Sequence, residues 1–245
     1  PDLINHHAAQ IRVDIAAKDP IFDAQINILG FLNLLQAAKN VKSVKKIILA
    51  STGGAMYGPQ PTPFIETMLP QPLSPYGISK LADERYLYFY RQQYGIDYVA
   101  LRYANVYGPR QNPHGEAGVV AIFCDNFLTG QQPVINGDGK QTRDYVYISD
   151  VVTANLMATE KNIIGEFNIG TAIETDVNQI YDLVRQEFAS DQPAVHGPPR
   201  PGEQPTSSLD YTLAQAKLGW TPTVSLQDGI HRTVGFFKHQ KSLTT

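Results

Sequence analysis

The sequence has few of the features that mark several large classes of protein. It contains one cysteine, Cys124, which rules out an intramolecular disulfide and a cysteine-rich metal cluster. Its 20 Lys and Arg residues are scattered and are outnumbered by 23 Asp and Glu, whereas nucleic-acid binding usually shows as a basic excess. No apolar run approaches the ~18 residues of a membrane-spanning helix. These absences predict a cytoplasmic protein that binds neither nucleic acid, membrane nor metal.

What is present is an alternation of short apolar runs with amphipathic stretches. The runs typical of buried parallel strands are 2–5, 46–51, 97–104 and 166–170. Residues 20–40 and 76–94 carry apolar side chains three or four positions apart, as helices do. Strands alternating with helices predict an α/β fold, a Rossmann-like doubly wound parallel sheet built from right-handed crossovers.

Candidate chemistry lies in "SPYGISK" at 74–80, where Tyr76 precedes Lys80 by four residues. On a helix these two side chains share one face. A tyrosine, with a reference pKa of about 10, is a poor base at neutral pH, but a nearby cation favours the phenolate. Tyr76 could then take a proton from a sugar hydroxyl while hydride leaves the same carbon. The pattern alone is short, and an exposed helix with a solvated lysine explains it equally well.

The surrounding segments favour the catalytic interpretation. "ASTGGAMYG" at 50–58 and "LRYANVYGPRQNP" at 101–113 each place polar groups where a predicted strand ends. Open α/β sheets bind their ligands at the carboxyl ends of the strands. Hydroxyl, phenol and amide groups at successive strand ends therefore predict one shared site.

The order of these motifs resembles the extended short-chain dehydrogenase/reductase family. Besides those quoted, "INHHAAQ", "QTRDYVYISDVV", "EFNIGTA" and "PPRPGE" occur in the expected order along essentially the whole chain. "STGGAMYG" together with "NPHGEAGVVAIF" looks most like the UDP-glucose 4-epimerases of the family. The resemblance implies bound NAD, a UDP-hexose substrate, and epimerisation at C4 through a 4-keto intermediate.

The resemblance also implies which residues serve the cofactor and the chemistry. Tyr76 matches the base and Lys80 the lysine that holds the nicotinamide ribose. The other positions matched to the cofactor are His7, Ala8, Ala9, Asn27 and Tyr103. The family often has Ser or Thr where this chain has Gly53, so Thr52, or else Ser51, is expected to supply that hydroxyl.

A second set of residues matches the nucleotide-sugar site. Asn105, Arg143 and Arg200 match the amide and the two guanidinium groups that bind the diphosphate. Glu203 matches the acceptor for the uridine ribose hydroxyls, and Val119 is assigned to substrate binding. Ser207 falls where the family adjusts the room for a C2 substituent, and Asp144 is interpreted as structural.

One expected element is missing. The family begins with strands and a Gly-rich turn that bind the pyrophosphate, and no G-x-G-x-x-G or G-x-x-G-x-x-G occurs here. The first strand matches the family's fourth, so we expect these residues to be the C-terminal portion of a longer enzyme.

Several alternatives stay open at this point. A 4,6-dehydratase would need an Asp–Glu pair where the chain has Gly54 and Ala55, but epimerases of UDP-glucuronate or UDP-N-acetylglucosamine remain. A non-catalytic nucleotide-binding protein would bind ligand without turnover.

The resemblance also suggests a division of the chain and an assembly. Residues 1–112 and about 143–172 are expected to form the NAD-binding region, and about 113–142 and 173–245 the nucleotide-sugar region. In the family the helices matching 20–40 and 76–94 pair across a homodimer.

Overall fold

The computed structural model describes residues 1–114, 118–199 and 204–243. Its centre is a four-stranded parallel sheet of order β1-β2-β3-β8, formed by β1 (Leu3–His6), β2 (Lys46–Thr52), β3 (Asp97–Tyr103) and β8 (Gly165–Ile169). Thr52 pairs in register with Tyr103, and Tyr103 with Ile169, so these strands end together at one edge. The parallel α/β sheet predicted from the apolar runs is confirmed.

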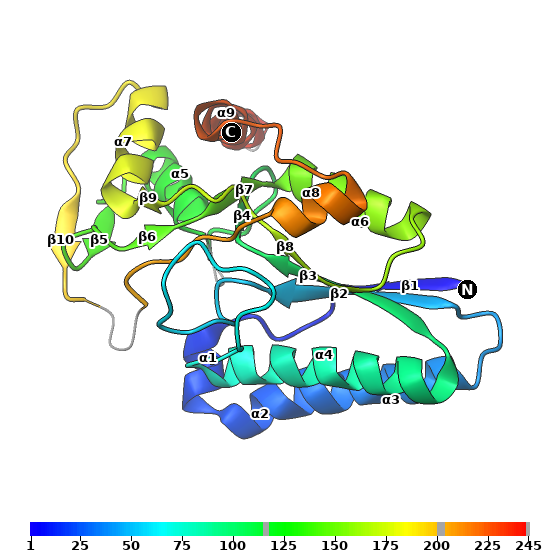
Figure 1. The fold of residues 1–245 in the computed structure, drawn as a ribbon. Helices are drawn as coiled ribbons and strands as arrows, with labels where there is room; N and C mark the ends of the chain where they lie inside the picture. The colour runs from blue at the N-terminus through cyan, green and yellow to red at the C-terminus, as the bar shows by residue number, and fades with distance from the viewer. Residues whose placement is uncertain (115–117, 200–203, 244–245) are drawn as a thin grey trace.

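Helices cover both faces of this sheet (Figure 1). One face carries α1 (Val13–Lys18), α2 (Pro20–Ala24), the π-helical turn η1 (Gln25–Leu29), α3 (Gly30–Lys39) and α4 (Pro75–Tyr94). The other carries α6 (Ile148–Glu160) and α8 (Thr212–Leu218). The layers meet in two apolar clusters, one around Leu49 under α3 and α4 and one around Ile48 under α6 and α8.

Local sequence explains where α4 begins and ends. The Ser74 hydroxyl accepts from the Gly77 N–H, and Pro75 occupies the first helical position. Gly95 ends the helix in a left-handed conformation at φ 68°. Because the loop before Ser74 returns from the end of β2, the first turn of α4 is delivered to the carboxyl edge of the sheet.

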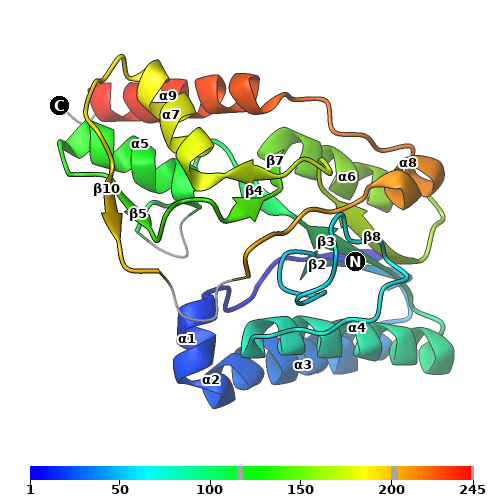
Figure 2. The same cartoon turned by 60° about the vertical axis from the view of Figure 1, so that its left-hand side comes forward.

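A second group of elements lies beyond that edge (Figure 2). It contains β4 (Asn105–Tyr107) paired with β7 (Tyr145–Tyr147), β5 (Val134–Asn136) with β10 (Val195–Gly197), and β6 (Thr142–Arg143) with β9 (Thr175–Asp176). Its helices are α5 (Val119–Thr129), α7 (Val177–Glu187) and α9 (Leu226–Ser242), packed around Phe123, Ile180 and Val234. Trp220 and α8, by contrast, pack with β8 and α6. The division into two regions therefore stays a prediction, with α8 a point where they share a core.

The helical stretch Pro20–Lys39 differs from the sequence expectation. By length and composition, at mean hydropathy 1.2, it is apolar enough to cross a membrane, although no uninterrupted run of that length exists. A core helix passes the same test, and here Phe31, Leu35 and Ala38 are buried against the sheet. What sets this helix apart is that much of its apolar surface is exposed, including Ile21, Ile26 and Leu29.

Candidate active site

The first turns of α4 carry the proposed catalytic pair. Tyr76 is half-buried at the second helical position, and Lys80 follows one turn later and is buried. The Lys80 ammonium lies 3.8 Å from the Asp83 carboxylate, one turn further along the helix. Burial lowers the pKa of Lys80, opposed by the negative charges of Asp83, Asp23 and Glu84. Lys80 is thus a buried cation among carboxylates, and a buried charge of this kind can shift the pKa of neighbouring groups.

The end of β1 faces this lysine. Burial and the Lys80 charge together lower the pKa of His6 to about 4, and they also lower the pKa of His7. His6 stacks on Phe31, with ring centroids 4.9 Å apart. Ala8 and Ala9 follow as small side chains beside the edge of the sheet, with Ala8 exposed. His7, Ala8 and Ala9, which were matched to the cofactor, therefore lie near Lys80, the lysine predicted to hold the nicotinamide ribose.

Tyr103, the last residue of β3, lies at the same edge of the sheet. Its hydroxyl accepts from the Asn155 amide at 2.8 Å and lies 3.4 Å from His7 Nε2. The His7 and Tyr103 rings are nearly parallel, with centroids 6.3 Å apart. Tyr103 and His7 thus lie together, as the prediction for the cofactor site requires.

Asn27 occupies a buried position in η1 with a complete set of local partners. Its amide donates to the Gln10 carbonyl and to Asp23, and its Oδ1 accepts from the Gln10 N–H at 2.8 Å. Asp23 also accepts from Gln10 Nε2 and, at 2.7 Å, from the Ser79 hydroxyl. Asn27 therefore binds the loop after Ala9, and Asp23 connects both to α4. A contact of Asn27 with the cofactor stays a prediction.

The two candidate hydroxyls at the end of β2 differ in their partners. Ser51 is buried and donates to Glu84 Oε1 at 2.6 Å, so its proton is committed to α4. Thr52 is half-buried, and its Oγ1 accepts from the Ala55 N–H at 3.2 Å. Thr52 is consequently the better placed of the two to donate to a ligand. A Cβ at Gly53 would lie 2.4 Å from Leu209 Cδ1, so a Ser or Thr at this position would require the Leu209 side chain to move.

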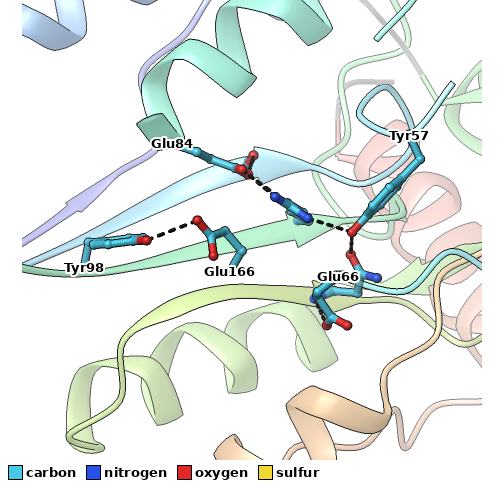
Figure 3. Close-up of polar contacts among 8 residues, drawn as sticks. Tyr57, Glu66, Glu84, Tyr98 and Glu166 are labelled. Carbon is cyan, nitrogen blue, oxygen red and sulfur yellow. Dashed lines mark hydrogen bonds and ion pairs between the residues drawn. The ribbon is translucent and has the colours of Figure 1, made fainter. Parts of the chain in front are cut away.

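A buried polar network, which the sequence analysis missed, connects this strand end to α4 (Figure 3). Arg102 on β3 donates to both oxygens of Glu84, at 3.0 and 2.7 Å, and also to the Tyr57 hydroxyl at 2.8 Å. Tyr57 donates to Asn168 on β8, whose backbone N–H donates to Glu66. Burial raises the pKa of Tyr57 to about 12, which keeps it a hydrogen-bond donor. A charged residue inside the apolar run 97–104 was the one signal for this network.

Two of the residues predicted to bind the nucleotide sugar, Asn105 and Ser207, lie beside Gly54, just beyond the end of β2. A Cβ placed on Gly54 would lie 3.7 Å from Asn105 Oδ1 and 4.0 Å from Ser207 Oγ, so these three positions are neighbours. Asn105 is exposed, whereas Ser207 is buried. Val119 begins α5 and packs against the core of the second group of elements.

Arg143 lies in β6, half-buried, and its Nη1 donates to the Thr142 carbonyl at 2.7 Å. Its position in the short antiparallel pair with β9 is next to Asp144, whose backbone carbonyl accepts from the Asn105 N–H. Arg143 thus adjoins the segment that carries Asn105. The remaining two predicted residues, Arg200 and Glu203, lie outside the described residues.

Asp144 is buried and holds three segments together. Its carboxylate accepts from the Thr171 N–H and hydroxyl, from the Ala172 N–H, and from the Leu209 N–H. Burial raises the pKa of Asp144, and these donors oppose the rise. The structural role predicted for Asp144 agrees with these contacts, which attach the segment carrying Ser207 and Leu209 to the end of β8.

A parallel sheet with a tyrosine, a buried lysine and polar side chains at its carboxyl edge defines a Rossmann-like nucleotide-dependent enzyme. The chain belongs to the NAD dependent epimerase/dehydratase family, whose model matches residues 1–170. NAD is the cofactor of this enzyme family, and the small side chains after β1 beside the buried Lys80 cation fit a dinucleotide. Within the described residues no group of three or more His, Cys, Asp or Glu is placed to hold a metal ion.

Several characterised proteins are similar along nearly the whole chain. UDP-glucose 4-epimerase of Mycolicibacterium smegmatis is 45% identical over 98% of this chain and 77% of its own length. The crystal structure of UDP-glucose 4-epimerase from Thermotoga maritima with UDP-glucose is 50% identical, with a TM-score of 0.95, over 98% of this chain and 78% of that one. The Thermus thermophilus enzyme in complex with NAD is 42% identical, with a TM-score of 0.91, over 97% and 78%.

Proposed function

We propose that this protein is a UDP-sugar 4-epimerase that interconverts UDP-glucose and UDP-galactose with tightly held NAD. The observation that carries the proposal is the placement of Tyr76 and buried Lys80 on one face of α4 at the carboxyl edge of the sheet. The similarity to UDP-glucose 4-epimerases at 45–50% identity supports the choice of reaction.

The residues of this chain would share the chemistry as follows. Tyr76 takes the proton of the C4 hydroxyl and later returns one, because the positive charge of Lys80 favours its phenolate form. Thr52 donates a hydrogen bond to the hexose oxygen, and Ser51 fixes the strand by its bond to Glu84. NAD, when bound, supplies the hydride acceptor at C4. Loss of the hydroxyl proton to Tyr76 and of the C4 hydride to that acceptor would together leave a 4-keto sugar, which must rotate before the hydride is returned to its other face.

Binding of the substrate falls to the second group of elements. Asn105 and Arg143 are proposed to meet the diphosphate, and Ser207 to border the hexose beside Gly54. Arg200 and Glu203 complete the set in this proposal, as second guanidinium and ribose acceptor. His7, Ala8, Ala9 and Tyr103 line the cofactor side.

Ser207 is the reason to consider a UDP-N-acetylhexosamine as an alternative substrate. Its small side chain, 4.0 Å from the position of a Cβ on Gly54, leaves room that a UDP-N-acetylhexosamine could use. Dehydration is disfavoured because Gly54 and Ala55 supply no acid–base pair at that position.

We also propose a homodimer in the cytoplasm, formed through the helical face that the sheet leaves exposed. Ile21, Ile26 and Leu29 are 70%, 45% and 55% exposed along one helical stretch, and Tyr88 and Phe89 are exposed on the adjacent α4. Exposed apolar side chains on two neighbouring helices are typical of an interface between copies. Sedimentation at micromolar concentration should give twice the protomer mass, and a monomer mass would contradict this assembly.

The reaction is tested with NAD-loaded protein and UDP-galactose, using UDP-glucose dehydrogenase to detect the product. We expect wild-type turnover, and Tyr76→Phe should lose roughly 10²–10⁴-fold in kcat because general base catalysis is removed. Tyr88→Phe, on the same helix but exposed, is the matched control and should retain activity.

Two further results would decide between the alternatives. Tyr76→Phe with wild-type kcat would contradict the assignment, and nucleotide binding without turnover of any UDP-hexose would favour a non-catalytic protein. Parallel assays with UDP-N-acetylglucosamine and UDP-glucuronate identify the preferred sugar.

A further inference from the structure

Asp83 is a buried carboxylate next to the proposed catalytic pair that the network of Figure 3 does not use. It is 1% exposed, and its Oδ2 lies 3.8 Å from the Lys80 ammonium. None of the described residues donates a hydrogen bond to its Oδ1. A buried carboxylate without donors is costly to keep ionised, so its presence one turn from Lys80 calls for a physical account.

The neighbouring carboxylates are satisfied by other groups. Glu84 on α4 is bound by Arg102 from β3 and by Ser51 from β2. Asp23 on α2 accepts from Ser79, Gln10 and Asn27, on α4, the loop after β1, and η1. Asp83 differs from both because no described residue donates a hydrogen bond to its Oδ1, and its Oδ2 faces the Lys80 ammonium at 3.8 Å.

The electrostatic surroundings place Asp83 near its titration point at neutral pH. Burial raises its pKa to about 7, Lys80 opposes the rise, and the negative charges of Glu84 and Asp23 add to it. Lys80 is also close enough to His6 and His7, after β1, to lower their pKa values. The ammonium therefore lies near both a carboxylate that can change charge and the edge where the cofactor is proposed to bind.

We propose that Asp83 is a positioning residue for Lys80: its ionised carboxylate draws the ammonium back along α4, and uptake of one proton from solvent releases it toward the edge at His6 and His7. The inference rests on the proposed function, in which Lys80 acts at that edge. It makes the position of Lys80, and so the phenolate form of Tyr76, depend on one buried proton.

The first measurement is the pH dependence of unfolding, which needs no turnover. The folded-state pKa of Asp83 lies above its unfolded value, so its ionisation destabilises the folded state progressively as pH rises from about 4 to 7. In Asp83→Asn this loss should be absent. The ratio of the folding constant of Asp83→Asn to that of wild type should rise by up to about tenfold per pH unit across this interval.

The matched control is Asp182→Asn on α7. Asp182 faces Arg185 with the same three-residue spacing and is exposed, so its ratio should stay nearly constant with pH. An Asp83→Asn ratio that is equally flat would overturn the inference, because Asp83 would then ionise without cost.

The second measurement is the kcat–pH profile of the complete NAD-loaded protein. At pH 6 Asp83→Asn should match wild type, and at pH 8 its kcat should exceed that of wild type by about threefold or more, since no carboxylate competes for Lys80. Equal or lower kcat at pH 8 would overturn the positioning role while leaving epimerisation intact. A wild-type protein without turnover would overturn the proposed function, and this inference with it.

Discussion

Two regions of the molecule use carboxylates in opposite ways. On the cofactor side, Glu84 is buried and paired with a buried guanidinium, Arg102, through two hydrogen bonds. On the substrate side, Asp144 is equally buried but is bound by backbone N–H groups and a hydroxyl. Glu174, further out, is exposed and accepts from the hydroxyls of Thr62 and Thr142. Of these three carboxylates, Glu84 is held by an opposite charge, whereas Asp144 and Glu174 are held by neutral donors.

The difference concerns how each side can open. A buried ion pair cannot separate without leaving two charges in a poorly solvating interior. A carboxylate bound by hydroxyls near the surface can exchange them for water at little cost. The buried Glu84–Arg102 pair therefore makes the strands beside α4 hard to move, while the exposed Glu174 attaches the segments bearing Thr142 and Ser208 by bonds that water can replace. That difference agrees with the proposed function, in which NAD stays bound and the UDP-sugar exchanges.

The largest expected effect comes from breaking the charged side. Glu84→Gln leaves Arg102 buried without its counter-charge, and the free energy of unfolding should fall by about 3–5 kcal/mol. Urea denaturation at pH 7 measures this change. Adding Arg102→Met should recover much of the loss, because the unpaired charge is then removed.

The exposed pair of Asp182 and Arg185 supplies the comparison. Asp182→Asn should change the unfolding free energy by less than about 1 kcal/mol. If Glu84→Gln is as mild as Asp182→Asn, the buried pair does not hold the cofactor side together and the contrast between the two regions fails.

The order of strands and helices could be predicted because it rests on local patterns. The apolar runs at 46–51 and 97–104 became β2 and β3, and the spacing in 76–94 became α4. The site could be predicted as far as residues at strand ends, since parallel strands end at one edge. That rule predicted Asn105 at the shared edge, whereas Ser207, its neighbour beside Gly54, was matched only through the family resemblance.

What could not be predicted are the partners of polar side chains. Ser51 and Thr52 are adjacent hydroxyls, and only the position of Glu84, 33 residues away from Ser51, shows which one is committed. Asp23 and Asp83 are polar residues on helices whose pattern suggests a solvated face, yet both are buried. Whether a charged side chain is buried depends on which distant segments pack against it. A periodicity of three or four residues along one helix cannot predict this.

On the substrate side, Asp144→Asn should have an intermediate effect. In wild type the donors share two carboxylate oxygens, whereas the amide of the variant offers them one oxygen and an NH2 group. The free energy of unfolding should therefore fall by about 2–3 kcal/mol. Because Leu209 and Ser207 lie on the released segment, KM for the UDP-sugar should rise more than kcat falls. A lower kcat at unchanged KM would mean that Asp144 supports the chemistry and not the attachment of this segment.

The smallest effect is expected at Glu174, whose carboxylate accepts from Thr142 at 2.6 Å and from Ser208 at 3.5 Å. Glu174→Ala should lower the unfolding free energy by less than about 1 kcal/mol, since the carboxylate is exposed to water. The hydroxyl donors lower the pKa of Glu174, so its contribution is present above its unfolded pKa of about 4.5 and is lost as pH falls through the folded value.

Wild type and Glu174→Ala should therefore differ at pH 7 and converge below pH 4 in paired urea titrations. Thr142 precedes Arg143 and Ser208 follows Ser207, so the variant should also raise KM for the UDP-sugar by a few fold at pH 7. Glu174→Gln, which keeps one acceptor oxygen for the hydroxyls, should fall between the two. A stability difference that persists unchanged at pH 3.5 would show that the packing of the side chain, and not its charge, attaches these segments, and the substrate side would then resemble the cofactor side more closely than its contacts indicate.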